Sequence, residues 1–122
     1  MIKRTIGTVC TGIDGVGVGA RDAGLELAWG IEIDPRLAEV ANFNLGNHVR
    51  VADMLDCDPY KFEWVNNLHF SLPCLRASVA NSTGEINEDG LRESPLDIAL
   101  ANKSIEFIEV LRPDVVTIEN VY

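Results

Sequence analysis

The chain has 122 residues and a formal net charge of −9, because 19 Asp and Glu outnumber 10 Lys and Arg. This length suits one domain with a real hydrophobic core, and no apolar run reaches the roughly 20 residues that span a bilayer. The acidic balance argues against a chain that grips nucleic acid by itself, because phosphate contacts need Lys and Arg. It indicates either an acidic surface that aids solubility or a basic binding surface on another polypeptide.

The cysteines Cys10, Cys57 and Cys74 are odd in number, and their spacing fits no zinc motif. This pattern favours free thiols in a reducing, cytoplasmic setting, with Cys10 and Cys57 inert. His48 and His69 belong to no metal-like cluster, so we expect them to be ordinary surface or strand residues and predict no metal site.

The first predicted elements are a strand, a glycine-rich turn and a short helix. Residues 5–10 form an apolar run typical of a buried strand, and residues 12–19 are rich in glycine. A short helix then runs to about Ala23 and ends at Gly24. Residues 27–33 predict a second strand.

The next helix has clear start and stop signals. Asp34 can cap it and Pro35 suits its first position, so the helix is expected to run to about Asn44 and to end near Gly46. A short third strand is predicted at residues 49–52.

The second half continues the alternation of strands and helices. Asp58 and Pro59 start a short helix, and residues 68–72 predict a fourth strand. Residues 73–94 are polar and are expected to form a long functional loop.

A long helix begins at Ser94 and Pro95 and ends at Pro113, and residues 115–118 predict a fifth strand. Alternating strands and helices predict an α/β fold with a parallel sheet and crossover helices. Ligands of such sheets bind at the carboxyl ends of the strands. The residues predicted there are Cys10 to Gly15, Glu32, Asp53, Pro73, Cys74 and Glu119.

The glycine-rich turn predicts a nucleoside-containing cofactor, because glycines let the backbone approach a ligand at a helix start. Glu32 follows Gly12 by 20 residues and can accept hydrogen bonds from ribose hydroxyls. Asp53 could accept from an adenine amino group with Met54 against the ring, or simply cap a turn. Residues 15–20 also fit GxGxxA, so a dinucleotide is a competing ligand.

Two strand ends carry side chains suited to catalysis. Cys74 follows Pro73 and is a candidate nucleophile, although most free cysteines are inert. Glu119 ends the last strand, where it could share a proton with a substrate ring nitrogen or be a plain surface acid.

Taken in order, these segments resemble the N-terminal half of the cytosine-5 DNA methyltransferases across essentially the whole chain. The resemblance rests on the Cys10 to Gly15 loop, Glu32-Ile33-Asp34, Asp53-Met54, Pro73-Cys74 and Glu119-Asn120-Val121. It implies a Rossmann-like fold that uses S-adenosylmethionine, with residues 1–122 as the N-terminal part of the catalytic domain. The implied cofactor-binding residues are Cys10, Gly12, Ile13, Gly15, Glu32, Ile33, Asp53, Met54, Pro73 and Leu100.

The resemblance also implies a reaction on duplex DNA, typical of restriction-modification, in which the target cytosine is flipped into a pocket. Cys74 would add to C6 of the cytosine, and Glu119 would hydrogen-bond and protonate N3. The methyl group of S-adenosylmethionine would pass to C5. Asn120 would brace the loop that holds Cys74.

The chain departs from the family pattern at three positions. Cys10 stands where the family usually has Phe, Asp14 where it has Gly, and Leu75 where it has Gln. The Asp14 carboxylate is expected near the methionine end of the cofactor, where it would repel the cofactor's carboxylate.

The family continues past Glu119-Asn120-Val121 with further strands, an Arg-containing motif, a target-recognition domain and a C-terminal helix. We therefore expect an incomplete subunit or fragment, inactive alone, that needs a second polypeptide with the missing motifs. An alternative is a catalytically inactive module that binds S-adenosylmethionine or a methyltransferase partner. A nicotinamide-dependent oxidoreductase fragment is a third reading, carried by GxGxxA and Glu32.

Overall fold

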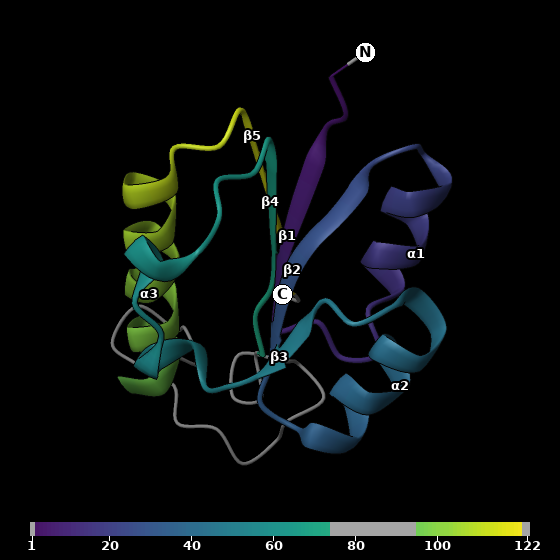
Figure 1. Cartoon of the computed structure of the whole chain (residues 1–122). Helices are drawn as coiled ribbons and strands as arrows, with labels where there is room; N and C mark the ends of the chain where they lie inside the picture. The colour runs from purple at the N-terminus through teal and green to yellow at the C-terminus, as the bar shows by residue number, and fades with distance from the viewer. Residues whose placement is uncertain (1, 74–94, 121–122) are drawn as a thin grey trace.

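In a computed structural model that describes residues 2–73 and 95–120, five parallel strands form one sheet with helices on both faces (Figure 1). The strands are β1 (Thr5–Val9), β2 (Glu26–Glu32), β3 (Val49–Val51), β4 (Asn67–Ser71) and β5 (Val115–Glu119). Their order across the sheet is β3-β2-β1-β4-β5, and every neighbouring pair is parallel. The predicted parallel α/β architecture is confirmed.

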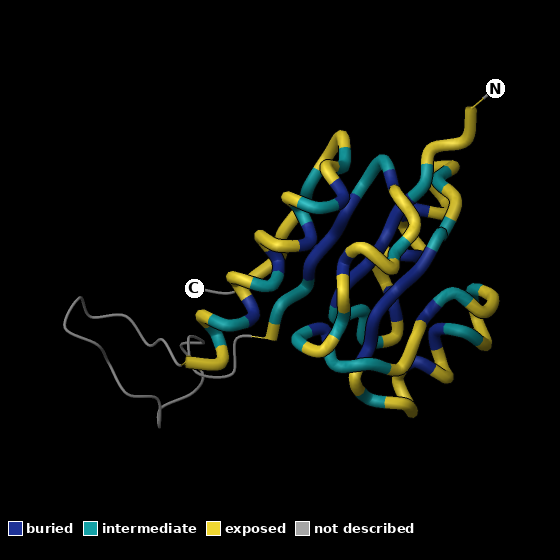
Figure 2. The backbone as a smooth tube through the Cα atoms, turned by 60° about the vertical axis from the view of Figure 1, so that its left-hand side comes forward, coloured by how far each residue is buried: buried dark blue, intermediate teal, exposed yellow. Residues whose placement is uncertain are grey.

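Three α-helices and two short 3-10 turns cover this sheet. The helices are α1 (Gly15–Asp22), α2 (Pro35–Leu45) and α3 (Pro95–Leu111), and the turns are η1 (Met54–Asp56) and η2 (Pro59–Lys61). Figure 1 shows α1 and α2 on one face and α3 with both turns on the other. Figure 2 shows the buried strands enclosed between helices whose outer faces are exposed. The predicted elements match, with bounds shifted by about one residue at most ends.

Local signals explain where α2 begins and ends. The Asp34 carboxylate accepts a hydrogen bond from the amide of Arg36 at 2.9 Å, and Pro35 occupies the first helical position. Gly46 follows the helix with φ of 86°, a conformation that favours glycine. These are the boundaries that the sequence predicts.

The first strand ends one residue earlier than predicted. Cys10 has φ of 58°, in the left-handed region, so the chain turns out of β1 directly after Val9. Asp14 also lies in the left-handed region, with φ of 62°, and its side chain caps α1 by accepting from the amide of Gly17 at 3.0 Å. With Gly12 at φ of 57°, three left-handed residues therefore shape the loop between β1 and α1.

An aromatic cluster fills the space between the sheet and α3. Phe107 contacts Trp29, Phe62 and Phe70, and Trp29 also contacts Phe62, with ring centroids 4.7 to 6.4 Å apart. The indole N–H of Trp29 donates to the carbonyl of Glu63 at 2.9 Å, so this buried ring keeps a polar partner. The cluster anchors α3 against the sheet.

β5 is an outer strand of the described sheet, paired along one side with β4. Its register places Glu119 opposite Ser71. Val116 packs against the core, whereas Val115, Ile118 and Glu119 are exposed. Within residues 2–73 and 95–120, no helix is both long and apolar enough to cross a membrane.

Candidate cofactor pocket and strand-end site

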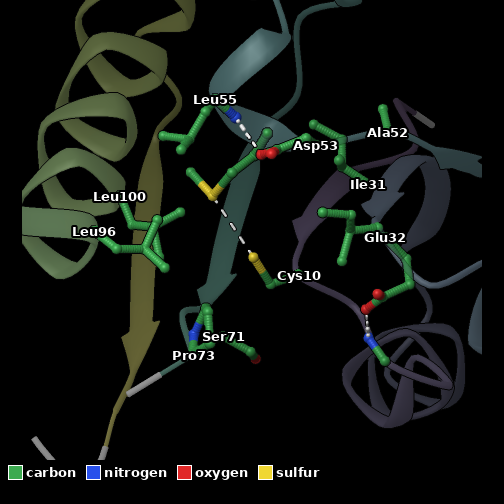
Figure 3. A pocket seen from close by; sticks show the side chains of 13 residues that line it. Cys10, Ile31, Glu32, Ala52, Asp53, Leu55, Ser71, Pro73, Leu96 and Leu100 are labelled. Atoms are coloured by element: carbon green, nitrogen blue, oxygen red, sulfur yellow. Dashed lines mark hydrogen bonds between the residues drawn. The ribbon is translucent and has the colours of Figure 1, made fainter. Parts of the chain in front are cut away.

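A pocket of about 350 Å³ lies at the carboxyl ends of the first four strands, beside the start of α3 (Figure 3). This is the edge of the sheet where the sequence predicts a ligand. The predicted residues that line it are Cys10, Gly12, Glu32, Ile33, Asp53, Met54, Pro73 and Leu100.

Glu32 has its carboxylate fixed by two backbone amides. Oε1 accepts from Gly12 at 2.7 Å and Oε2 accepts from Asp34 at 2.8 Å. The residue is only 7% exposed, yet it lines the pocket. Because a carboxylate oxygen can accept two hydrogen bonds, each oxygen keeps a free lone-pair direction. The geometry suits acceptance of two neighbouring hydroxyl groups.

Asp53 both caps a turn and lines the pocket. Its Oδ1 accepts from the amide of Leu55 at 2.9 Å, which starts η1. The buried Met54 lines the same cavity from η1, and the buried Leu100 lines it from α3. An acceptor beside apolar side chains is an arrangement that suits an aromatic ring with an exocyclic amino group.

Cys10 lies between the strand ends at the pocket. Its thiol is 3.6 Å from the sulfur of Met54 (Figure 3). Burial, with the negative charges of Glu32 and Asp53, raises the pKa of Cys10 to about 11. Burial also raises the pKa of Cys57, whose thiol lies 3.3 Å from the carbonyl oxygen of Asp53. Both thiols are therefore protonated near neutral pH, in agreement with an inert role.

Two of the predicted cofactor residues do not line the pocket. Ile13 is 56% exposed, and Gly15 is the first residue of α1. The structure adds five residues that we did not predict: Ile31, Ala52, Leu55, Ser71 and Leu96. Their positions in the sequence could have indicated them, because each lies at or near a predicted strand end or one helical turn before Leu100.

Of the two candidate catalytic residues, the structure describes Glu119 and not Cys74. Cys74 lies outside the described residues, so its distance to Glu119 stays a prediction. Pro73 lines the pocket, and Glu119 is exposed at the end of β5. Since β4 and β5 are neighbours and Ser71 is paired with Glu119, the chain leaves β4 at the same edge of the sheet.

Asp14 does not line the pocket, and its carboxylate is buried and paired. It is 1% exposed, and its Oδ2 lies 2.6 Å from Nε2 of His48. Nδ1 of His48 lies 2.8 Å from the carbonyl oxygen of Gly46, which can only accept. With an acceptor at each ring nitrogen, the doubly protonated imidazolium satisfies both contacts. The expectation that His48 is an ordinary surface residue is wrong, because its side chain is only 6% exposed and forms a buried ion pair.

His69 is buried on β4, consistent with its expected place in a strand. Its ring nitrogens lie 2.7 Å from Oγ1 of Thr117 and 2.8 Å from Oγ of Ser71. Burial lowers the pKa of His69, although the negative charges of Glu119 and Asp14 oppose this effect. Within the described ranges, no group of three or more His, Cys, Asp or Glu side chains could hold a metal ion.

The chain matches the family model of the C-5 cytosine-specific DNA methylases over residues 5–122. No curated protein sequence matches the chain.

The solved structures that resemble the fold include the following two. The Dnmt2 methyltransferase of S. pombe has a TM-score of 0.56 and 18% identity, over 66% of this chain and 26% of that one. Thermoplasma acidophilum 1320 has a TM-score of 0.58 and 21% identity, over 84% of this chain and 46% of that one. The chain therefore spans less than half the length of either protein. At these identities the likeness shows a shared fold, which is the methyltransferase fold expected from the sequence.

Proposed function

Because this chain belongs to the C-5 cytosine-specific DNA methylase family, we propose that it carries the cofactor pocket and the reacting side chains of a DNA (cytosine-5)-methyltransferase. The observation that carries the proposal is the strand-end pocket, where Glu32, Asp53 and Pro73 converge. Each comes from a segment on which the family resemblance rests. The GxGxxA alternative, a nicotinamide-dependent oxidoreductase, falls away because the family match includes Pro73-Cys74 and Glu119-Asn120.

The pocket residues fit S-adenosylmethionine. Glu32, held by the amides of Gly12 and Asp34, would accept hydrogen bonds from the two ribose hydroxyls. Asp53 would accept from the adenine amino group, with Met54 and Leu100 against the ring. When bound, the cofactor supplies an electrophilic methyl group.

The reacting side chains would act on a cytosine flipped out of duplex DNA. The thiolate of Cys74 would form a bond to C6, and Glu119 would donate a proton to N3, so that C5 becomes nucleophilic. After C5 takes the methyl group, its proton leaves to a base and the Cys74–C6 bond breaks. N3 returns its proton to Glu119, so the thiolate, the carboxylic acid and the aromatic ring are all restored.

We also propose a second polypeptide as a partner. Duplex DNA needs a basic surface, whereas this chain carries a net charge of −9. The exposed apolar residues Val115 and Ile118 on the outer strand β5 are suited to pairing with another chain.

Covalent trapping tests the catalytic part of the proposal. The chain would be incubated with S-adenosylmethionine and duplex DNA carrying 5-fluorocytosine, alone and with the product of a neighbouring gene. We expect an adduct with the partner present, its loss in Cys74→Ser, and its retention in the control Cys57→Ser. Adduct formation that survives Cys74→Ser would exclude this nucleophile.

A second candidate function is a cofactor-binding module without catalysis. The net charge of −9 and the exposed position of Glu119 favour it, because both leave DNA poorly held by this chain. Calorimetry would measure the binding of S-adenosylhomocysteine. Binding without any adduct or methyl transfer, with or without the partner polypeptide, would support the module and exclude the enzyme.

A further inference from the structure

The ion pair between Asp14 and His48 joins two parts of the chain at the loop that borders the pocket. The Asp14 carboxylate accepts from the amide of Gly17 at 3.0 Å and lies 2.6 Å from Nε2 of His48. His48 follows α2 and is held in turn by the carbonyl of Gly46 and by Oδ1 of Asn42, which accepts from its amide at 3.0 Å. The pair therefore fixes the start of α1 against the connection between α2 and β3.

The same loop forms one wall of the pocket. The amide of Asp14 donates to the carbonyl of Thr11 at 2.8 Å, and the amide of Thr11 donates to Ile31 at 3.1 Å. Gly12, between them, lines the pocket and donates to Glu32. Asp14 therefore lies two residues along the chain from the part of the pocket wall that Gly12 forms.

The charge of Asp14 needs compensation in this position. With the ribose at Glu32 and the adenine near Asp53, the methionine end of the cofactor would be left to the Gly12 side of the pocket. The first backbone amides of α1 favour a negative group, so the cofactor carboxylate is the group expected there. A bare Asp14 carboxylate would repel it, whereas a protonated His48 cancels that charge.

We propose that His48 is a positioning residue for the cofactor, which neutralises Asp14 and so allows the loop at Gly12 to accept the anionic methionine end. This inference rests on the proposed function, because it concerns the same pocket. His48 does not touch the cofactor in this scheme; it acts through Asp14.

The groups that contact His48 come from two parts of the chain. Asp14, at the start of α1, is the charged group that faces it, and Gly46 and Asn42 contribute neutral acceptors from the α2 side. His69, on β4, also feels the charge of Asp14. Burial lowers the pKa of His48, but the hydrogen bonds to Asp14 and Gly46 outweigh it and raise the pKa above its ordinary value. The protonated imidazolium is the form that satisfies the contacts to both Asp14 and Gly46.

Two ligands separate this role from a general effect on the pocket. S-Adenosylhomocysteine carries the amino-acid carboxylate, whereas 5′-methylthioadenosine has the same nucleoside without it. Calorimetry would measure both with the wild type, His48→Gln, Asp14→Asn and the double variant. Asp58→Asn is the matched control, since Asp58 caps the exposed turn η2 through Tyr60 and does not line the pocket.

We expect His48→Gln to weaken S-adenosylhomocysteine about tenfold, the effect of one uncompensated charge at several ångströms, and to leave 5′-methylthioadenosine unchanged. Adding Asp14→Asn should restore the affinity, because no charge then needs compensation. A double variant as weak as His48→Gln would overturn the inference, since a purely structural role predicts that result.

The wild type supplies a measurement that needs no variant to fold. Between pH 6 and 9, the affinity of the wild type for S-adenosylhomocysteine should fall relative to its affinity for 5′-methylthioadenosine, because His48 loses its proton. The double variant, where it folds, should lack this pH dependence and serves as a control. Equal pH profiles for the two ligands would overturn the inference and leave the proposed function standing. Failure of both ligands to bind the wild type would overturn the proposed function itself.

Discussion

The carboxylate of Glu32 accepts a hydrogen bond from the amide of Gly12 at 2.7 Å, which ties the end of β2 to the loop after β1. Two strands that are neighbours in the sheet are thereby joined again beyond their last ladder contact. The bond fixes the position of the carboxylate before any ligand arrives, so a ligand does not have to order it.

Glu32→Gln tests this preorganised acceptor. A glutamine retains one oxygen but presents an amide nitrogen to one of the two backbone donors, and it accepts hydroxyl protons poorly. We expect the affinity for S-adenosylhomocysteine to fall about 10- to 100-fold and the stability to fall by about 1–3 kcal/mol. Calorimetry and urea unfolding would measure these changes. Glu26→Gln, on the exposed start of the same strand, is the control and should change neither quantity.

Two glycine-to-alanine variants, one beside Trp29 and one away from it, test the packing around Trp29. In Gly7→Ala, the new Cβ would stand 2.6 Å from the Trp29 ring, so the variant should lose about 1–3 kcal/mol in urea unfolding. Gly19→Ala is the matched change in α1, where no atom lies within 4 Å of the added Cβ. It should gain about 0.5–1 kcal/mol, because alanine favours a helix. Equal stabilities for the two variants would contradict this account of Gly7.

The two histidines predict opposite pH effects on stability. The pKa of His48 is raised in the folded chain, so its stabilisation is complete below the ordinary histidine value and disappears as pH rises through the folded value. The pKa of His69 is lowered, so its contribution is lost as pH falls from the ordinary value through the folded value. Urea unfolding between pH 5 and 9 should show His48→Gln losing stability mainly at the acid end. The difference in the free energy of unfolding between His69→Gln and the wild type should change with pH in the opposite direction. If both differences changed with pH in the same direction, the directions assigned to the two pKa shifts would be refuted.

Cys10 should be chemically silent although it lies at the pocket. With a pKa of about 11, only about a thousandth of its thiol is ionised at pH 8. Iodoacetamide labelling followed by peptide mass analysis should therefore modify Cys10 far more slowly than an unfolded control in urea. Rapid labelling of Cys10 in the folded chain would contradict the raised pKa.

Local patterns made much of the fold predictable. The cap at Asp34, the proline at its first helical position and Gly46 at its end define α2 without tertiary information. Glu32 and Asp53 were predictable as pocket residues for a different reason, because parallel strands bring their carboxyl ends to one edge.

The Asp14–His48 pair was not predictable in this way. The two residues are 34 positions apart, and their contact depends on how the α2–β3 connection packs against the start of α1. Neither residue has a local pattern that names the other. The left-handed conformation of Cys10 was also missed, since an apolar run signals a strand but not the residue at which the chain turns away.

The contact between Asp14 and Gly17 has a consequence for how such a chain can change over generations. A Cβ on residue 17 would approach the Asp14 carboxylate too closely to be accommodated without movement. Asp14 is therefore tolerated only with glycine at 17, whereas Asp14→Gly meets no such steric limit, although it removes the cap of α1 and the partner of His48. Gly17→Ala should be severely destabilising in the present chain and much milder when combined with Asp14→Gly, a difference that urea unfolding would measure. The contact within this helix cap would then determine which of the two positions can mutate first.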